Sequence, residues 1–273
     1  MSEDSDEFLP VGITVDRTNR NIIVAYLISR SIVVYDHQGN RINKVKCESP
    51  DNEAPIHVRG LALDPVSKNF IIGDSNNKNI KIFSPEGHFI KSFGRFAELL
   101  NFTVDPINRN ILVSDHITNK IRVFDHIGTF LTKLSYLGHN EGELNYPHAM
   151  TVHPISQNII VCDLYNYRIQ IFDKSGQFLM MFEHICSSED DLTFPHGIVV
   201  DPSNQNIIIS NGGRNQIEIF NKEGVLMTKI GRTGFNIGKF YHPSYLDIDP
   251  ITGDLIICDE NYVQLFERHK LRK

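Results

Sequence analysis

The sequence predicts an all-β fold: a six-bladed β-propeller of four-stranded antiparallel blades, with a last blade of three strands. Three observations carry this prediction. Similar units recur six times along the 273 residues, each unit contains short β-rich runs between turn residues, and no long helical periodicity occurs. A small sheet cannot bury both of its faces alone. Six sheets packed around a central axis therefore explain the chain better than an open solenoid, which needs polar caps at both ends.

The repeating unit is clearest between Pro195 and Ile230. Its β-rich runs are separated by the turn residues Asp201-Pro202-Ser203-Asn204 and Asn221-Lys222-Glu223-Gly224. Proline presets φ at the second position of a turn, and glycine accepts the positive φ that tight hairpins need. The unit therefore forms a four-stranded antiparallel meander.

The unit recurs with a regular spacing. The equivalents of Asp201 lie 48, 41, 48, 48 and 48 residues apart, and they are Asp16, Asp64, Asp105, His153, Asp201 and Asp249. An apolar triplet begins six residues after each of them. A glycine follows 23 residues after the first five: Gly39, Gly87, Gly128, Gly176 and Gly224. So many coincidences indicate a repeat architecture rather than chance composition.

These repeats define one propeller over residues 9–268. The expected blades lie at about 9–46, 57–94, 99–137, 146–184, 194–232 and 243–266. Residues 1–8 form an acidic tail that we expect to be disordered, and residues 269–273 form a basic tail. The last repeat has no segment for a fourth strand, and the acidic tail is a poor β-former. We therefore expect an exposed outer edge on the last blade, a template for strand addition by a partner.

Composition is that of an ordinary globular protein, with 41% hydrophobic and 22% charged residues. The net charge of -6 does not favour binding of nucleic acid over the whole surface, and no DNA partner is expected. The chain has no apolar segment typical of a signal peptide or membrane span, so we expect a cytoplasmic protein without membrane contact. Cys162 and Cys258 occupy the same place in two repeats, which indicates buried core residues rather than disulfides.

The segment Asp163-Leu164-Tyr165-Asn166-Tyr167-Arg168-Ile169-Gln170-Ile171-Phe172 resembles the NHL repeat, and the glycine-rich run from Gly231 to Pro243 resembles the NHL connector. The resemblance extends from Leu9 to about Phe266. It implies a six-bladed propeller like the NHL domains of tripartite-motif proteins, which bind RNA or protein through one end of the channel. That end, here called the top, carries the loops between second and third strands and the residues just before each innermost strand.

Histidines are the first candidate functional group at the top. Pro147-His148 and Pro195-His196 are equivalent pairs in adjacent repeats, Arg59 stands at the same place in the second repeat, and His242 lies nearby in the sixth. In the NHL-type peptidyl-amidoglycolate lyases, such Pro-His pairs supply zinc-bound imidazoles. A catalytic zinc needs three protein ligands, and only two match here. We therefore expect hydrogen-bonding imidazoles or a polar ligand-binding ring, with no metal or other cofactor.

Carboxylates form the second group. The loop aspartates Asp74, Asp115, Asp163 and Asp259 resemble the calcium ring of lactonase propellers, but a residue present in nearly every repeat serves the same structural role in each. We expect them to accept backbone N–H bonds. Asp247 differs, because the other repeats hold threonine, alanine or valine at its position. A lone acid there is either paired or functional.

Cations and tyrosines in the loops form the third group. Arginine and tyrosine together suit phosphate contact and base stacking, and they equally suit protein interfaces. The alternative is that each cation pairs with the loop aspartate of a neighbouring blade. The loop cations are Arg30, Lys78, Lys120, Arg168 and Arg214, and the nearby tyrosines are Tyr26, Tyr146, Tyr165, Tyr167 and Tyr241.

The leading functional hypothesis is a non-enzymatic interaction module whose top binds a protein, with RNA as a sub-case. The alternative is a metal-dependent lyase or hydrolase that uses the channel mouth. The candidate binding residues are Arg59, Lys78, Lys120, Tyr146, His148, Tyr165, Tyr167, Arg168, His196, Arg214 and His242.

Overall fold

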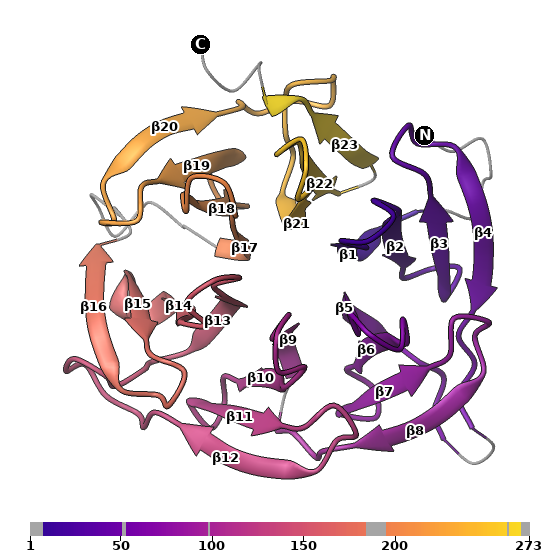
Figure 1. Cartoon of the computed structure of the whole chain (residues 1–273), viewed down its shortest axis with the longest axis horizontal. Helices are drawn as coiled ribbons and strands as arrows, with labels where there is room; N and C mark the ends of the chain where they lie inside the picture. Colours follow the sequence, from indigo (N-terminus) through magenta and orange to yellow (C-terminus); the bar gives the residue numbers. More distant parts are fainter. Residues whose placement is uncertain (1–7, 51–52, 98, 184–194, 261, 269–273) are drawn as a thin grey trace.

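The computed structural model describes residues 8–50, 53–97, 99–183, 195–260 and 262–268 (Figure 1). The acidic tail, which we expect to be disordered, lies outside the described residues except for its last position, Phe8. The basic C-terminal tail at 269–273 also lies outside them. Six antiparallel sheets stand radially around a central channel. The predicted six-bladed propeller with a three-stranded last blade is confirmed.

Each blade is a meander whose first strand lies nearest the axis (Figure 1). Blade one contains β1 (Pro10–Val15), β2 (Ile22–Tyr26), β3 (Ser31–Tyr35) and β4 (Arg41–Lys46). Blade two contains β5 (Val58–Leu63), β6 (Phe70–Asp74), β7 (Asn79–Phe83) and β8 (Phe89–Phe93). Blade three contains β9 (Leu99–Val104), β10 (Ile111–Asp115), β11 (Lys120–Phe124) and β12 (Phe130–Leu134).

The remaining blades follow the same order. Blade four contains β13 (Pro147–Val152), β14 (Ile159–Asp163), β15 (Arg168–Phe172) and β16 (Phe178–Glu183), with a 3-10 turn, η1 (Leu164–Asn166), after β14. Blade five contains β17 (Pro195–Val200), β18 (Ile207–Asn211), β19 (Gln216–Phe220) and β20 (Leu226–Ile230). Blade six contains β21 (Pro243–Ile248), β22 (Leu255–Asp259) and β23 (Tyr262–Phe266).

The core lies between neighbouring blades. The second strand of every blade is buried along its whole length, because both of its faces pack against other blades. Between blades four and five, for example, Ile160 and Ile169 pack with Ile198 and Ile209. The apolar triplets of the repeat therefore supply the interfaces that hold the ring together.

Small residues allow the innermost strands to approach closely. A Cβ atom on Gly12 would lie 2.6 Å from the Leu61 nitrogen, and one on Gly197 would lie 2.7 Å from the Ser244 oxygen. Both contacts are to the backbone of the next blade, so a side chain at either glycine would push two strands apart.

The turns between first and second strands form the bottom end of the channel, opposite the top. Ion pairs join the bottom of one blade to the next: Lys68 to Asp16 at 2.7 Å, Arg109 to Asp64 at 2.8 Å and Arg20 to Asp249 at 2.8 Å. The Arg20 pair links blade one to blade six. It therefore helps to close the ring, where β1 packs beside β21 (Figure 1).

Blade six ends at an open edge. No strand pairs with the outer side of β23 within the described residues, and Tyr262 and Leu265 are 51% and 42% exposed. The expected exposed edge is thus confirmed, whereas strand addition by a partner stays a prediction. Among the residues that the structure describes, no helical segment has the length and apolar character needed to cross a bilayer. Cys47, Cys162 and Cys258 are buried free thiols, and Cys186 lies outside the described residues.

Candidate functional site

Two imidazoles from adjacent blades meet at the top of the channel. His148 lies on β13 and His196 on β17, and their ring centroids are 5.0 Å apart in an edge-to-face arrangement. Each follows a proline at the start of the strand, and the strand register shifts directly after that proline in both blades. A β-bulge of this kind re-aims a side chain. The shared bulge therefore brings the two equivalent histidines to one place.

Hydrogen bonds hold the pair in position. The Nδ1 atom of His148 lies 2.9 Å from the Pro195 carbonyl oxygen. Because a carbonyl only accepts, Nδ1 carries the proton and donates, which leaves Nε2 of His148 as the basic nitrogen. The Asn101 amide donates to the His196 carbonyl at 3.1 Å, and the Ser114 hydroxyl donates to the His148 carbonyl at 3.2 Å. Side chains of blade three thus hold the backbone of both histidines.

Burial keeps both imidazoles neutral. It lowers the pKa of His148 to about 3, with a smaller contribution from the charge of His196. Burial likewise lowers the pKa of His196 to about 4, and the positive charges of Arg59 and His242 lower it further. At neutral pH the pair therefore presents two uncharged rings that can take up a proton.

An aromatic surface leads from solvent to the histidines. Tyr165 stacks on Tyr146 at 4.4 Å between ring centroids, and Tyr146 contacts the buried His116 at 4.2 Å. Tyr146 also lies parallel to His148, at 6.5 Å. Since Tyr165 is 53% exposed and stacks on Tyr146, these two rings, here called the aromatic shelf, offer an aromatic face to a ligand that approaches His148, with the buried His116 behind them.

Two residues of this site were not among the sequence candidates. His116 follows Asp115 directly, where the other repeats hold leucine, serine, glycine or glutamate, so its departure from the repeat was the available signal. Tyr245 is placed on β21, and burial raises its pKa to about 12 while the charge of Arg59 opposes this shift. The Tyr245 phenol therefore stays protonated at neutral pH.

Arg59 and His242 complete the mouth. Arg59 is an exposed residue of β5, and its charge acts on His148, His196 and Tyr245. His242 is exposed just before β21, where its N–H donates to the Asn215 side chain at 2.7 Å and its ring contacts Tyr241 at 4.9 Å. Residues of blades two to six thus surround the top mouth of the channel. The rim of this mouth carries the positive charge of Arg59.

The other loop candidates lie farther along the blades. Lys78 and Tyr167 are exposed turn residues with positive φ, Lys120 begins β11, and Arg214 lies 3.9 Å from Glu218. Arg168 is buried, and its guanidinium bonds to Asp163 at 2.8 Å and to three carbonyl oxygens of the preceding connector. This guanidinium fixes the connector to blade four rather than facing a partner at the surface.

The loop aspartates act as predicted from their periodicity. Asp163 accepts the Asn145 N–H at 2.6 Å, and Asp259 accepts the Tyr241 N–H at 2.8 Å. The expected pairing of a loop cation with the aspartate of a neighbouring blade is wrong for Arg168. Arg168 pairs with Asp163, and Arg122 pairs with Asp115 at 2.9 Å, each within one blade. The reason is geometric: the third strand runs directly beside the loop of its own blade.

The donor set at the histidine pair does not fit a catalytic zinc site. Such a site needs three protein ligands. Across the described ranges, no group of three histidine, cysteine, aspartate or glutamate side chains is placed to hold a metal ion.

No protein-family model and no curated protein matches this sequence. Solved structures match over nearly the whole chain. The virginiamycin B lyase of Staphylococcus aureus is 16% identical, with a TM-score of 0.64 over 96% of this chain and 85% of that chain. A catalytically inactive histidine-to-alanine variant of that lyase, solved with quinupristin, is 16% identical, with a TM-score of 0.66 over 98% of this chain and 87% of that chain. A streptogramin B lyase is 12% identical, with a TM-score of 0.68 over 97% and 95%.

These likenesses correct two expectations. The similar structures are lyases rather than NHL domains of tripartite-motif proteins, and this finding overturns the expectation of a module without enzymatic activity. Identities of 12–16% establish the shared propeller fold and leave the reaction to be argued from the site. Binding of a protein or RNA partner at the top stays a prediction.

Proposed function

We propose that this chain is a lyase whose active site is the histidine mouth of the channel. The observation that carries the proposal is the pair of buried, neutral imidazoles, His148 and His196, beside the cationic Arg59. The lyase activity of the structurally similar proteins supports it, as does the inactivity of one of them after a histidine-to-alanine change.

An elimination needs a base, a stabiliser of negative charge and a proton for the leaving group. His196, the less buried of the two imidazoles, takes the proton from a carbon next to an electron-withdrawing group. The electron pair of that C–H bond forms the new double bond while the leaving group departs with its own bonding pair. Protonated His196 then returns the proton to the leaving group. Arg59 stabilises the negative charge that develops in between.

His148 acts as a positioning residue in this scheme. Its Nδ1–H donates to the carbonyl of Pro195, the residue before His196, so His148 fixes the backbone from which His196 projects. The aromatic shelf then provides the surface for a planar or aromatic part of the substrate. Virginiamycin B and quinupristin are therefore the first compounds to test.

The experiment incubates the purified chain with each compound and follows the products by mass. Hydrolysis adds the mass of one water, whereas an intramolecular elimination that opens a ring leaves the mass unchanged. We expect an opened product of unchanged mass. His196→Ala should lower kcat/KM by about 100-fold to 10,000-fold, the usual contribution of a positioned general base.

His88→Ala is the matched control, because His88 is an exposed histidine in the outer turn of blade two, away from the channel. It should leave the rate unchanged. If His196→Ala turned over the compound at the wild-type rate, the active site would not be the histidine mouth. Products that carry an added water would replace the lyase with a hydrolase, and no turnover of either compound would refute activity on this substrate class.

A further inference from the structure

The two residues that depart most from the repeat meet inside the channel. At the innermost position of the first strand, two residues before the turn, only blade six has a charged residue: the six members are Thr14, Ala62, Thr103, Thr151, Val199 and Asp247. Directly after the turn aspartate or histidine, only blade one has a charged residue: the six members are Arg17, Pro65, Pro106, Pro154, Pro202 and Pro250. Asp247 and Arg17 belong to the two blades that close the ring.

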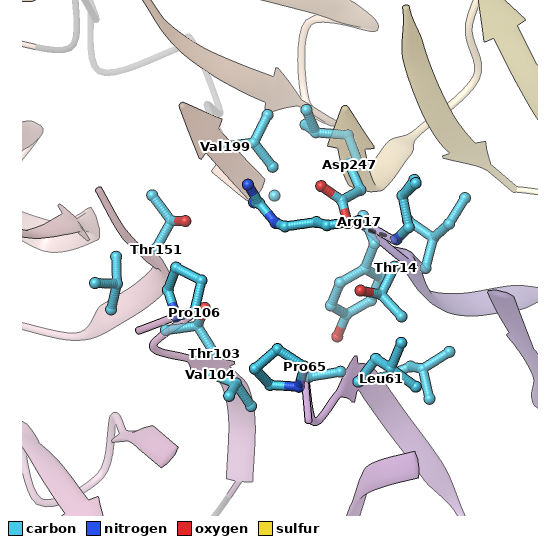
Figure 2. Close-up of a pocket in the computed structure, with 18 of the residues that line it drawn as sticks. Thr14, Arg17, Leu61, Pro65, Thr103, Val104, Pro106, Thr151, Val199 and Asp247 are labelled. Atoms are coloured by element: carbon cyan, nitrogen blue, oxygen red, sulfur yellow. Dashed lines mark hydrogen bonds between the residues drawn. The ribbon is translucent and has the colours of Figure 1, made fainter. Parts of the chain in front are cut away.

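Both residues line a cavity of about 160 Å³ in the channel, which extends from the bottom turns up to Asn101 and Gly197 beside the histidine pair. Figure 2 shows this cavity with Asp247 and Arg17 on one side, and with Thr103, Thr151 and Pro106 on the other. A molecule of water occupies roughly 30 Å³ in the liquid, so the space admits a ligand of a few heavy atoms.

The carboxyl group of Asp247 is held on both oxygens. The Val15 N–H donates to Oδ2 at 2.8 Å, and the Ile248 N–H donates to Oδ1 at 2.7 Å. The Thr14 hydroxyl also bonds to this carboxyl, whose pKa burial raises. A carboxyl group that accepts three donors keeps room for one more polar contact, from a ligand.

Arg17 provides the complementary charge. Its side chain passes Asp247 and directs the guanidinium across the channel towards Val199 (Figure 2). Its positive charge acts on the Asp247 carboxyl and opposes the effect of burial on the pKa of that group. A guanidinium is a planar fork of donors that matches the two oxygens of a carboxylate. Its position above the cavity is therefore suited to the acidic end of a small molecule.

We infer that the bottom of the channel binds a small carboxylic acid that carries an amino or hydroxyl group. Its carboxylate pairs with Arg17, its amino or hydroxyl group donates to Asp247, and the hydroxyls of Thr103 and Thr151 lie on the facing wall. Arg17 and Asp247 take no part in the proposed elimination, although the cavity wall also includes Tyr245 and Asn101, which donates to the His196 carbonyl. Failure of the proposed lyase activity would therefore not contradict this inference.

The test is a titration of the full chain by nuclear magnetic resonance with glycine, glycolate, acetate and methylammonium. The amides of Val15 and Ile248 are the readout, because both donate to Asp247. We expect their shifts to move with glycine or glycolate at the lowest concentrations. Acetate and methylammonium, which each lack one of the two groups, should bind about tenfold more weakly or less.

Two variants restore the repeat and should therefore fold: Arg17→Pro introduces the residue of the other five turns, and Asp247→Thr introduces the residue of three other blades. Each should weaken binding at least about tenfold, while Lys174→Ala, an exposed cation of blade four, should not. Shifts of the same size in Arg17→Pro, or acetate binding as tightly as glycolate, would overturn the inference. So would the absence of any shift with all four compounds.

Discussion

His148 shows how a single buried residue couples the site to the stability of the fold. Its imidazole is 9% exposed, and burial lowers its pKa from 6.5 to about 3. In the unfolded chain the ring binds a proton below about pH 6.5. The folded protein excludes that proton until much lower pH. Between these values the unfolded state holds more protons, so the free energy of unfolding falls as the pH falls.

We therefore expect acidification to destabilise the protein through His148. One such group changes the free energy of unfolding by about 1.4 kcal/mol per pH unit within the window, or about 2 kcal/mol between pH 7 and pH 5. Asp259 acts in the opposite direction, because burial raises its pKa to about 6 and its contribution is lost as the pH rises.

Comparison with His148→Asn removes this second effect, since Asp259 is common to both proteins and the asparagine amide can still donate to Pro195. Urea unfolding at pH 7 and pH 5 is the measurement. The wild type should lose about 2 kcal/mol more than the variant. Equal losses would show that His148 takes up a proton in the fold as readily as in the unfolded chain.

At the scale of elements, the outer turns explain why one glycine recurs in the first five repeats. Gly176 and Gly224 both have positive φ, at 87° and 80°. A Cβ atom on Gly176 would lie 2.5 Å from the Leu134 side chain, and one on Gly224 would lie 2.4 Å from the Phe182 ring. In each case the contact is with the fourth strand of the preceding blade. The glycine thus serves both the hairpin and the packing of one blade on the next.

Gly224→Ala should consequently destabilise the protein by about 1–3 kcal/mol, through the strained φ and the displaced Phe182 ring. Gly238→Ala is the informative control, because Gly238 also has positive φ, at 83°, but has no atom within 4 Å of its Cβ position. Urea unfolding of both variants separates the two causes. A loss no larger in Gly224→Ala than in Gly238→Ala would mean that contact between blades adds nothing.

For the whole molecule, the distinctive feature is a ring whose blade six has three strands among the described residues. Arg268 follows β23 and supplies contacts between the last blade and its neighbour. It reaches Asp201 of blade five at 3.2 Å, and its N–H donates to Asp254 at 2.8 Å. Gly253 leaves the necessary space, since a Cβ atom there would lie 2.7 Å from the Arg268 side chain. The arginine after the last strand thus stands where the bottom turns of blades one to three place Arg20, Lys68 and Arg109.

Arg268→Ala should loosen the last blade. The lost ion pair is partly exposed, so the global free energy of unfolding should fall by no more than about 1 kcal/mol. Amide exchange over Tyr262–Phe266 should nevertheless accelerate, because β22 is the one strand that pairs with β23 in the described ranges. Arg109→Ala removes a similar pair between blades two and three and should leave this exchange unchanged. Unaltered exchange in Arg268→Ala would mean that the pair has no part in closure.

The sequence predicted the fold well, because spacing alone determines which residues reach the interfaces between blades. Asp201, Gly224 and the apolar triplets identified strands and turns without any knowledge of contacts. The site was predicted only in part. His148 and His196 were placed together by their equivalent positions, whereas the burial of Arg168 and the contact of His116 with Tyr146 depend on side-chain packing between elements. The function could not be predicted from the repeat pattern, since one propeller fold supports many activities.

The most direct test of the proposed lyase is the dependence of kcat/KM on pH, measured with the streptogramin that the chain turns over. If neutral His196 is the base, kcat/KM should rise with a midpoint near its pKa of about 4 and stay level through neutral pH. Because the charge of Arg59 lowers this pKa, Arg59→Gln should move the rise to higher pH and reduce the plateau. A rise centred near 6.5 in the wild type, or one that Arg59→Gln leaves in place, would contradict the assignment of His196 as the base.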